Sequence, residues 1–144
     1  MHLGRRIIAS AGLGALALVG SISVAQVASA APDVTGHVYV NDNTAGTNSI
    51  GAFDRHADGT LTRAAGSPFA AGGAGTGTVT GSQGALQVTA DGRYLLAVDA
   101  GSNQISVLRI RRDGSLRQVA GNPVWSGGIE PVSIAVHGNV VYVA

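Results

Sequence analysis

The stretch NSIGAFDRHADGTLTRAAGSPFAAGG at residues 48–73 decides the fold, because it returns as NQISVLRIRRDGSLRQVAGNPVWSGG at residues 103–128. A constant offset separates the two copies (103 − 48 = 55). Ten of the 26 aligned positions are identical, among them both Asp-Gly pairs and both prolines. A repeat with a period near 50 residues and many short strand signals is typical of β-propellers and related arrays.

Each copy predicts the same order of short strands. Alternating or continuous apolar residues mark the strands. Each Asp-Gly pair predicts a tight hairpin turn of type I′, in which both central residues have positive φ. The glycine-rich residues 70–81 follow neither period and are predicted to form a loop. The predicted strands cover residues 37–41, 49–55, 60–64, 86–90, 94–98, 104–110, 116–119, 132–136 and 140–144.

Four strands per unit predict a propeller blade. The apolar runs at residues 94–98 and 140–143 do not alternate, as expected for middle strands that neighbouring blades cover on both faces. The segments before these runs match at an offset of 46, which pairs Val88 with Ile134 and gives the glycine-rich loop 55 − 46 = 9 extra residues. A β-sandwich is the alternative, but it would not repeat its strands and turns so closely. The predicted fold class is all-β, with blades of four antiparallel strands, about two blades plus the start of a third, after a helical signal peptide.

The amino terminus has the layout of a secretory signal peptide. Arg5 and Arg6 precede an apolar run at residues 7–24, and small residues follow at positions 28–30. We expect cleavage after Ala30, which leaves a partial propeller at residues 31–144 in a secreted or extracytoplasmic location. An uncleaved membrane anchor is the alternative. The arginine pair leaves both general secretory and twin-arginine export open.

Composition limits the partners of the mature chain. The chain after position 30 contains seven arginines and eight acidic residues, so its formal charge is 7 − 8 = −1. No basic field points to nucleic acid, and after cleavage no stable membrane span is expected. Cysteine is absent, so an exported domain would hold together without disulfides. The oligomeric state is left open.

Several stretches resemble a known family. Residues 92–103, followed by 105–109 and 113–116, are similar to the blade repeat of the lactonase-family seven-bladed β-propellers, the 6-phosphogluconolactonase and carboxymuconate lactonising-enzyme type. Residues 130–136 and 140–144 resemble the opening strands of the next blade. The resemblance implies a propeller that hydrolyses a sugar-derived or other small lactone. YVTN-type repeat propellers share the blade pattern and have no known chemistry.

Ser82, Gln83 and Glu130 are the candidate ligand-channel residues. They precede the innermost strands, which line the central channel of a propeller, and a lactone or carbohydrate-derived molecule is the ligand that the resemblance implies. The family's enzymes usually carry a Pro-His pair at this point. The matching positions are taken as Gln83-Gly84 and Ile129-Glu130, which lack the histidine, and the catalytic residues stay unassigned.

Other polar residues have structural interpretations. Asp58, Asp91 and Asp113 each precede a glycine in a predicted turn, and His137 holds the matching position before Gly138. Asp99 is expected to cap a turn at the end of a strand. His56 is placed in the loop before Asp58 and His37 at the start of a strand, and neither has a predicted partner. The arginines at positions 109, 111 and 112 are interpreted as a solvated strand edge.

No cofactor and no metal site is predicted. The glycines at positions 73, 75, 77 and 81 do not match a dinucleotide-binding fingerprint, which also needs a helix. Residues 41–43 resemble the start of a calcium loop, but Ala45 replaces the third ligand and no glutamate follows at the twelfth position.

Three functional hypotheses stay open from the sequence. The chain is an exported lactone hydrolase, a non-catalytic extracytoplasmic binding module, or an inactive fragment of such a propeller. Closed propellers have about four to eight blades, so the units counted here predict the amino-terminal portion of a larger ring.

Overall fold

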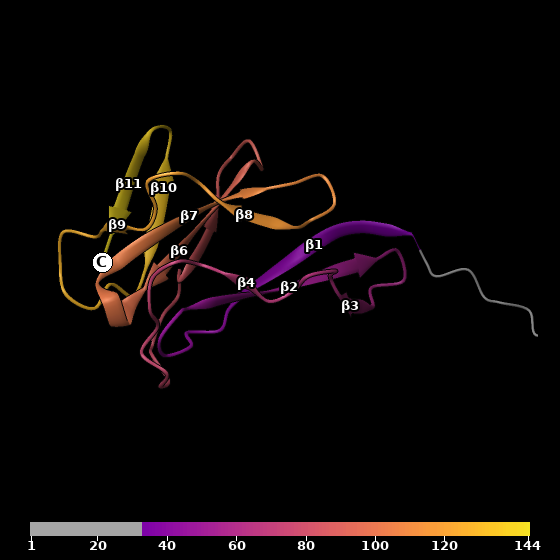
Figure 1. The fold of residues 1–144 in the computed structure, drawn as a ribbon. Coiled ribbons are helices and arrows are strands. Elements are labelled where there is room, and N and C mark those ends of the chain that lie inside the picture. The colour runs from indigo at the N-terminus through magenta and orange to yellow at the C-terminus, as the bar shows by residue number, and fades with distance from the viewer. Residues whose placement is uncertain (1–32) are drawn as a thin grey trace, which may run out of the picture. The chain divides into compact units, whose positions relative to one another are not determined.

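A computed structural model describes residues 33–144, and these residues form β-strands and one short 3-10 helix, η1 (Ala100–Ser102) (Figure 1). The all-β fold class is therefore confirmed. The predicted signal peptide and its cleavage after Ala30 lie outside the described residues. Within residues 33–144, no helix has the length and apolar character that crossing a membrane would require.

The second copy of the repeat, together with the two strands before it, forms a complete four-stranded blade. The strands of this second blade pair antiparallel in the order β5-β6-β7-β8, and β9 also pairs with β7. Because β8 pairs with one end of β7 and β9 with the other, the two short strands form one interrupted outer strand. The strands are β5 (Leu86–Val88), β6 (Tyr94–Asp99), β7 (Gln104–Ile110), β8 (Leu116–Gln118) and β9 (Val124–Trp125).

The first copy, together with the strand before it, forms an equivalent sheet, the first blade, with three strand positions. It has the order β1-β2-β3, with β4 on the same side of β2 as β3. In this sheet β1 corresponds to β6 of the second blade. Among the described residues no strand pairs with the free edge of β1, where β5 pairs with β6 in the second blade. The strands are β1 (Val34–Asn41), β2 (Ser49–His56), β3 (Leu61–Arg63) and β4 (Phe69–Ala70). The first strand begins three residues earlier than predicted, and His56 belongs to β2 rather than to the following loop.

The two copies agree down to individual hydrogen bonds. The backbone N–H of Ala52 donates to the Ser67 hydroxyl at 2.8 Å, and the equivalent N–H of Val107 donates to the Asn122 side-chain oxygen at 3.1 Å. Both acceptors precede a proline, and both X-Pro bonds are cis. A polar side chain thus takes the place of a ladder partner where the outer strand is interrupted, in both blades.

The Asp-Gly turns differ in type from the prediction. Only the glycines have positive φ, 84° at Gly59 and 75° at Gly114, whereas a type I′ turn needs two such residues. Gly59 N–H donates to His56 O, and His56 N–H donates to Thr60 O. This is the three-residue loop in which a turn is followed by a left-handed glycine.

A third unit begins with the antiparallel hairpin of β10 (Ile134–His137) and β11 (Val140–Val143). Ile134 pairs with Val143 as Leu86 pairs with Ala97. The inner strands therefore match at an offset of 48 (134 − 86 = 48), and the predicted pairing of Val88 with Ile134 is wrong by two residues. The hairpin turn of the third unit is two residues shorter, and the glycine-rich loop carries 55 − 48 = 7 extra residues rather than nine.

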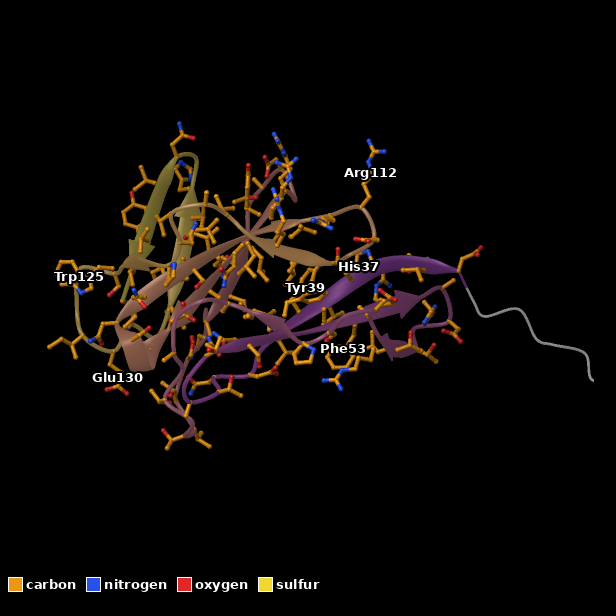
Figure 2. All side chains as sticks on the ribbon, viewed as in Figure 1. His37, Tyr39, Phe53, Arg112, Trp125 and Glu130 are labelled. Atoms are coloured by element: carbon orange, nitrogen blue, oxygen red, sulfur yellow. The ribbon has the colours of Figure 1, made fainter. Side chains whose placement is uncertain are left out.

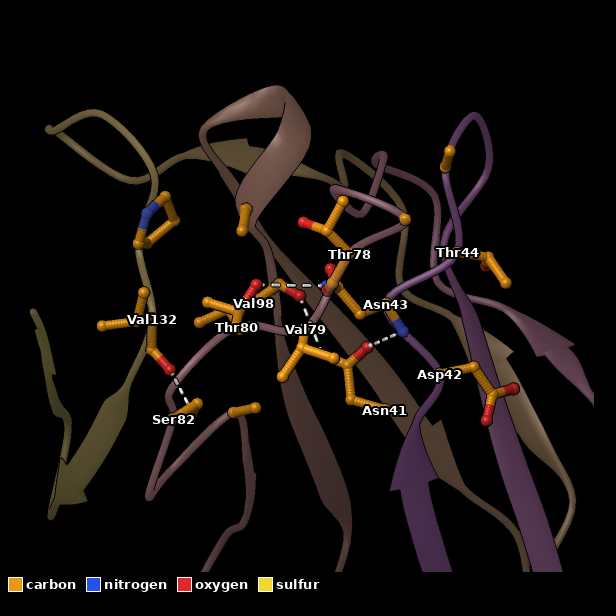
Figure 3. Close-up of a pocket in the computed structure, with 15 residues that line it drawn as sticks. Asn41, Asp42, Asn43, Thr44, Thr78, Val79, Thr80, Ser82, Val98 and Val132 are labelled. Carbon is orange, nitrogen blue, oxygen red and sulfur yellow. Dashed lines mark hydrogen bonds between the residues drawn. The ribbon is translucent and has the colours of Figure 1, made fainter.

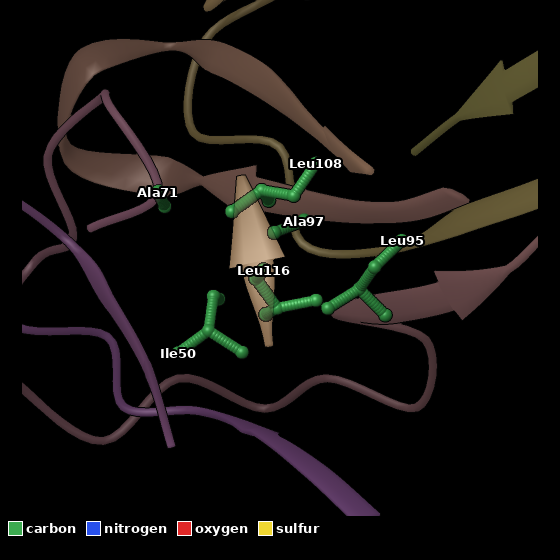
Figure 4. Close-up of a cluster of buried hydrophobic side chains, with 6 residues drawn as sticks. All are labelled: Ile50, Ala71, Leu95, Ala97, Leu108 and Leu116. Atoms are coloured by element: carbon green, nitrogen blue, oxygen red, sulfur yellow. The ribbon is translucent and has the colours of Figure 1, made fainter. Parts of the chain in front are cut away.

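Apolar side chains pack the two blades face to face. One buried cluster joins Ile50 and Ala71 of the first unit to residues of the second, namely Leu95, Ala97, Leu108 and Leu116 (Figure 4). Burial of each of the large aliphatic side chains contributes about 1.5–3 kcal/mol to folding. The blades therefore share one core.

The second blade is also packed on its other face. Leu96, Val98 and Ile105 form a second buried cluster with Ile134 of β10. Successive residues of β6 point to opposite faces, so both faces of this strand are covered and five of its six residues are buried. This confirms the interpretation of the continuous apolar run at residues 94–98.

Candidate functional site

A cavity of about 1080 Å³ opens among four segments that connect or end the strands (Figure 3). These segments are the loop after β1, the glycine-rich insertion, the end of β6 with η1, and the residues just before β10. The lining consists of Asn41, Asp42, Asn43, Thr44, Ala45, Gly77, Thr78, Val79, Thr80, Ser82, Ala85, Val98, Ala100, Pro131 and Val132. Both inner strands begin beside this cavity, because Ala85 and Val132 of its lining shortly precede β5 and β10.

The side chain of Asn43 holds the insertion in place. Its Nδ2 donates to Thr76 Oγ1 at 2.7 Å, to the Thr78 carbonyl at 2.8 Å and to Thr80 Oγ1 at 3.3 Å. Its Oδ1 accepts the Thr76 N–H at 2.9 Å. Asn43 has a φ of 49°, a left-handed conformation in which asparagine is enriched. One amide therefore organises residues 76–80 as a wall of the cavity.

A buried polar network lies behind this wall and joins the blades. Asn48 Nδ2 donates to Asp99 Oδ1 at 2.8 Å and to Asn41 Oδ1 at 3.0 Å. Asn41 Nδ2 donates to the Val98 carbonyl at 2.9 Å, and the Ser106 hydroxyl donates to Asp99 Oδ2. Asn48, Asp99 and Ser106 are fully buried.

The prediction that Asp99 caps a turn is wrong. Asp99 precedes η1, but its side chain makes no capping hydrogen bond. Its carboxylate points into the junction between the blades, where Asn48 and Ser106 satisfy it. A Cβ on Gly73 would lie 2.5 Å from Asp99 Oδ2, so a glycine is needed for this close approach. The signal was present in the repeat, since Asn48 and Gly73 are both identical in the two copies.

Ser82 is the only one of the three predicted channel residues that lines the cavity. Its hydroxyl donates to the Val132 carbonyl and accepts the Gly84 N–H at 3.3 Å. This contact ties the start of one inner strand to the start of the next.

Gln83 and Glu130 are exposed and lie outside the lining. Glu130 has a φ of 53°, and its N–H donates to Asn103 Oδ1 at 2.7 Å. Figure 2 shows its side chain at the far end of the second blade from His37. The offset of 48 also matches Gln83-Gly84 to Pro131-Val132 rather than to Ile129-Glu130. The corrected pair also lacks a histidine.

Among the residues that line the cavity, Asp42 alone has an ionisable side chain. It is exposed, and its Oδ2 accepts the Ser49 hydroxyl at 2.9 Å. Residues 33–144 contain no group of three or more His, Cys, Asp or Glu side chains that could hold a metal ion.

A smaller cavity of about 490 Å³ lies at the opposite end of β1, lined by His37, Asp54, Arg112 and Asp113 among others. His37 Nδ1 lies 3.0 Å from Asp54 Oδ1, so the prediction that His37 has no partner is wrong. The two residues are directly opposite each other on β1 and β2. Figure 2 shows His37 and Arg112 at this end of the sheets.

Tyr39, on the same strand as His37, joins the first blade to the second. Its hydroxyl donates to the Gly114 carbonyl at 2.9 Å. Burial raises the pKa of Tyr39 above its usual value, and the carboxylates of Asp113 and Asp54 raise it further.

The turn aspartates have the structural role that the sequence predicted. Thr60 donates to Asp58, Thr89 to Asp91 and Ser115 to Asp113, each through its hydroxyl. These hydrogen bonds are the main cause that lowers the pKa of each carboxyl, and a backbone N–H adds to the effect. His56 contacts Thr62 Oγ1 at 2.7 Å, so it also has a partner that was not predicted. The exposed side chain of Arg109 lies 5.9 Å from the ring centre of Tyr94, but β7 is paired on both sides at this residue, so the prediction of a solvated strand edge is wrong for Arg109.

Comparison with known proteins gives one family match. The model described as lactonase, 7-bladed beta-propeller matches residues 37–144. No curated protein and no solved structure gives a significant match. The matched region includes the first blade from His37 onward, the whole second blade, the β10-β11 hairpin and the whole cavity lining.

Proposed function

This chain belongs to the lactonase family of seven-bladed β-propellers, and on that premise we propose that its larger cavity binds a small neutral lactone or a related carbohydrate-derived molecule. The proposed location is outside the cytoplasm, because residues 1–30 have the layout of a signal peptide. Binding without turnover is the primary proposal.

The charge of the cavity lining carries this proposal. One carboxylate, that of Asp42, is the only ionisable side chain of the lining, and the other polar groups are amides and hydroxyls. A phosphorylated sugar lactone would bring negative charge next to Asp42 without a cation in the lining to pair it, which is unfavourable. A neutral ring with hydrogen-bond acceptors avoids this cost.

Lactone hydrolysis at the same site is the second candidate. In this reaction a water oxygen adds to the carbonyl carbon, the ring C–O bond breaks, and a hydroxy acid is released. A base must take the proton of the water, and donors must stabilise the oxyanion. Asp42 is the carboxylate in the lining that could serve as the base, which is the observation that favours this candidate.

Titration of the purified protein with γ-butyrolactone and D-ribonolactone, followed by ¹H–¹⁵N NMR, tests binding, and the signals of the hydroxy acids report turnover. We expect saturable shifts and no hydrolysis above the rate without protein. If hydrolysis is observed, Asp42→Asn should abolish it, while Asp91→Asn, an exposed turn carboxylate outside the cavity, should not. Absence of saturable shifts with any neutral lactone would refute the proposed function.

Export is tested separately. Expression of the full chain in a bacterial host, followed by fractionation and amino-terminal sequencing, should give an extracytoplasmic protein that begins at Ala31. A cytoplasmic protein with an intact leader would contradict this part of the proposal.

A further inference from the structure

We propose that the cavity prefers a lactone that carries an alkyl chain over a polyhydroxylated sugar lactone. This inference rests on the proposed function, and it narrows the ligand class within it.

The polar side chains that line the cavity are already hydrogen-bonded to other groups of the protein. Each of the seven polar side chains in the lining makes a hydrogen bond within the protein. Asn41 and Asn43 are the most fully used, because each employs both its amide nitrogen and its amide oxygen. A ligand rich in hydroxyls would compete with these bonds for the amide groups of the lining, and each bond that it displaced would offset part of the gain from its own hydroxyls.

The apolar side chains of the lining are available for contact. Val79, in the insertion, is a completely exposed residue, with a relative accessibility of 102%. In the view of Figure 3, Val79 lies between Val132 on one side and Asn43 on the other. Ala85 and Val132 are half-buried, and they come from the segments that lead into the two inner strands. These residues together provide an apolar surface for an alkyl chain.

Hydrogen bonds fix the conformation of the wall segment that carries Val79. It lies in the loop that is seven residues longer than the loop at the same place in the next unit, and the Asn43 amide fixes the residues on both sides of it. The apolar surface of Val79 would be buried from water only when a ligand fills the cavity. The hydroxyls of Thr44 and Thr78 are at the exposed rim, where the ester group of such a ligand stays hydrated.

The test compares three lactones with the same five-membered ring. γ-Nonalactone carries a pentyl chain, γ-butyrolactone carries none, and D-ribonolactone carries hydroxyls. Isothermal titration calorimetry with the purified protein should show γ-nonalactone binding at least about tenfold more tightly than either of the others, since each buried methylene contributes roughly fourfold.

Two matched variants locate the alkyl contact. Val79→Ser should weaken γ-nonalactone binding about four- to tenfold and leave γ-butyrolactone binding unchanged. Val124→Ser, at an exposed valine on β9 outside the cavity, should change neither. Equal or tighter binding of D-ribonolactone, or an unchanged γ-nonalactone affinity in Val79→Ser, would overturn the inference while the proposed function stands. Failure of all three lactones to bind would instead refute the proposed function.

Discussion

The side-chain amide of Asn48 in the first blade donates a 2.8 Å hydrogen bond to the carboxylate of Asp99 in the second, and both side chains are fully buried. The contact joins two copies of one repeat at the back of the candidate site. It means that the packing of the blades and the shape of the cavity depend on the same residues.

Asn48→Ala should destabilise the protein by about 2–3 kcal/mol, because it leaves a buried carboxylate oxygen without its donor. Chemical denaturation followed by circular dichroism measures the change. Asn139→Ala, in the exposed turn between β10 and β11, is the control and should have almost no effect. Equal effects of the two substitutions would show that the bond between the blades does not contribute.

Gly114→Ala and Gly59→Ala form a matched pair at the same position of the two repeats. Both glycines have positive φ, so each substitution should cost about 1–2 kcal/mol in backbone strain. Gly114→Ala should lower the free energy of unfolding by about 1–3 kcal/mol more than Gly59→Ala. The new Cβ at position 114 would lie 2.2 Å from His37 Nδ1, whereas the space at Gly59 is open. The difference in the free energy of unfolding between the variants isolates the contact between the blades. A difference near zero would contradict the packing of Gly114 on His37.

Leu95→Ala should destabilise the protein by about 2–5 kcal/mol, because it opens a cavity in the core that the two blades share. Leu61→Ala, at an exposed leucine on β3, should cost much less. Thermal unfolding of both variants provides the measurement, and a similar loss at the two positions would argue against a shared core.

The turn carboxyls should titrate below the usual value of about 4. The folded pKa values of Asp58, Asp91 and Asp113 are lowered, so their contribution to stability is present above the unfolded pKa and is lost as the pH falls through the folded values. Thr60→Val should return the pKa of Asp58 toward its usual range and leave Asp113 unchanged. Carboxyl ¹³C NMR titration measures each group, and an unchanged Asp58 would exclude the Thr60 hydroxyl as the main cause.

Much of the fold could be predicted from the repeat. Identical Asn, Asp-Gly and Pro positions at one offset identify equivalent strands and turns, and the boundaries of β7 agree with the prediction to the residue. The error in the third unit has a physical reason. A shift of two residues keeps every side chain of a strand on its own face, so the alternation of Ile134 and Val136 fits either offset, and only the hydrogen-bonded register with β11 decides between them.

The site was less predictable because its contacts join residues distant in sequence. Ser82 could be placed from its position before an inner strand. Asn43 acts on Thr76, 33 positions away, through a loop without periodicity, and no local pattern indicates this contact. His37 and Asp54 were within reach of sequence reasoning, since aligning the two strands in antiparallel register places them opposite each other.

Asn43→Ala should loosen residues 76–80 without unfolding the blades, while the backbone bond from the Gly77 N–H to the residue 43 carbonyl remains. The Thr76 N–H, which donates to Asn43 Oδ1, should lose its protection from hydrogen exchange, while amides in β6 and β7 keep theirs. Lactone affinity should fall because the wall of the cavity is no longer fixed. Retained protection at Thr76 would show that the insertion is held by other contacts.

Mapping a bound ligand tests the central claim most directly. With γ-nonalactone added to the ¹⁵N-labelled protein, the largest amide shift changes should fall at Ala45, Val79, Ala100 and Val132, which line the larger cavity on four separate segments. Shifts concentrated instead around His37 and Arg112, at the smaller cavity, would contradict the account.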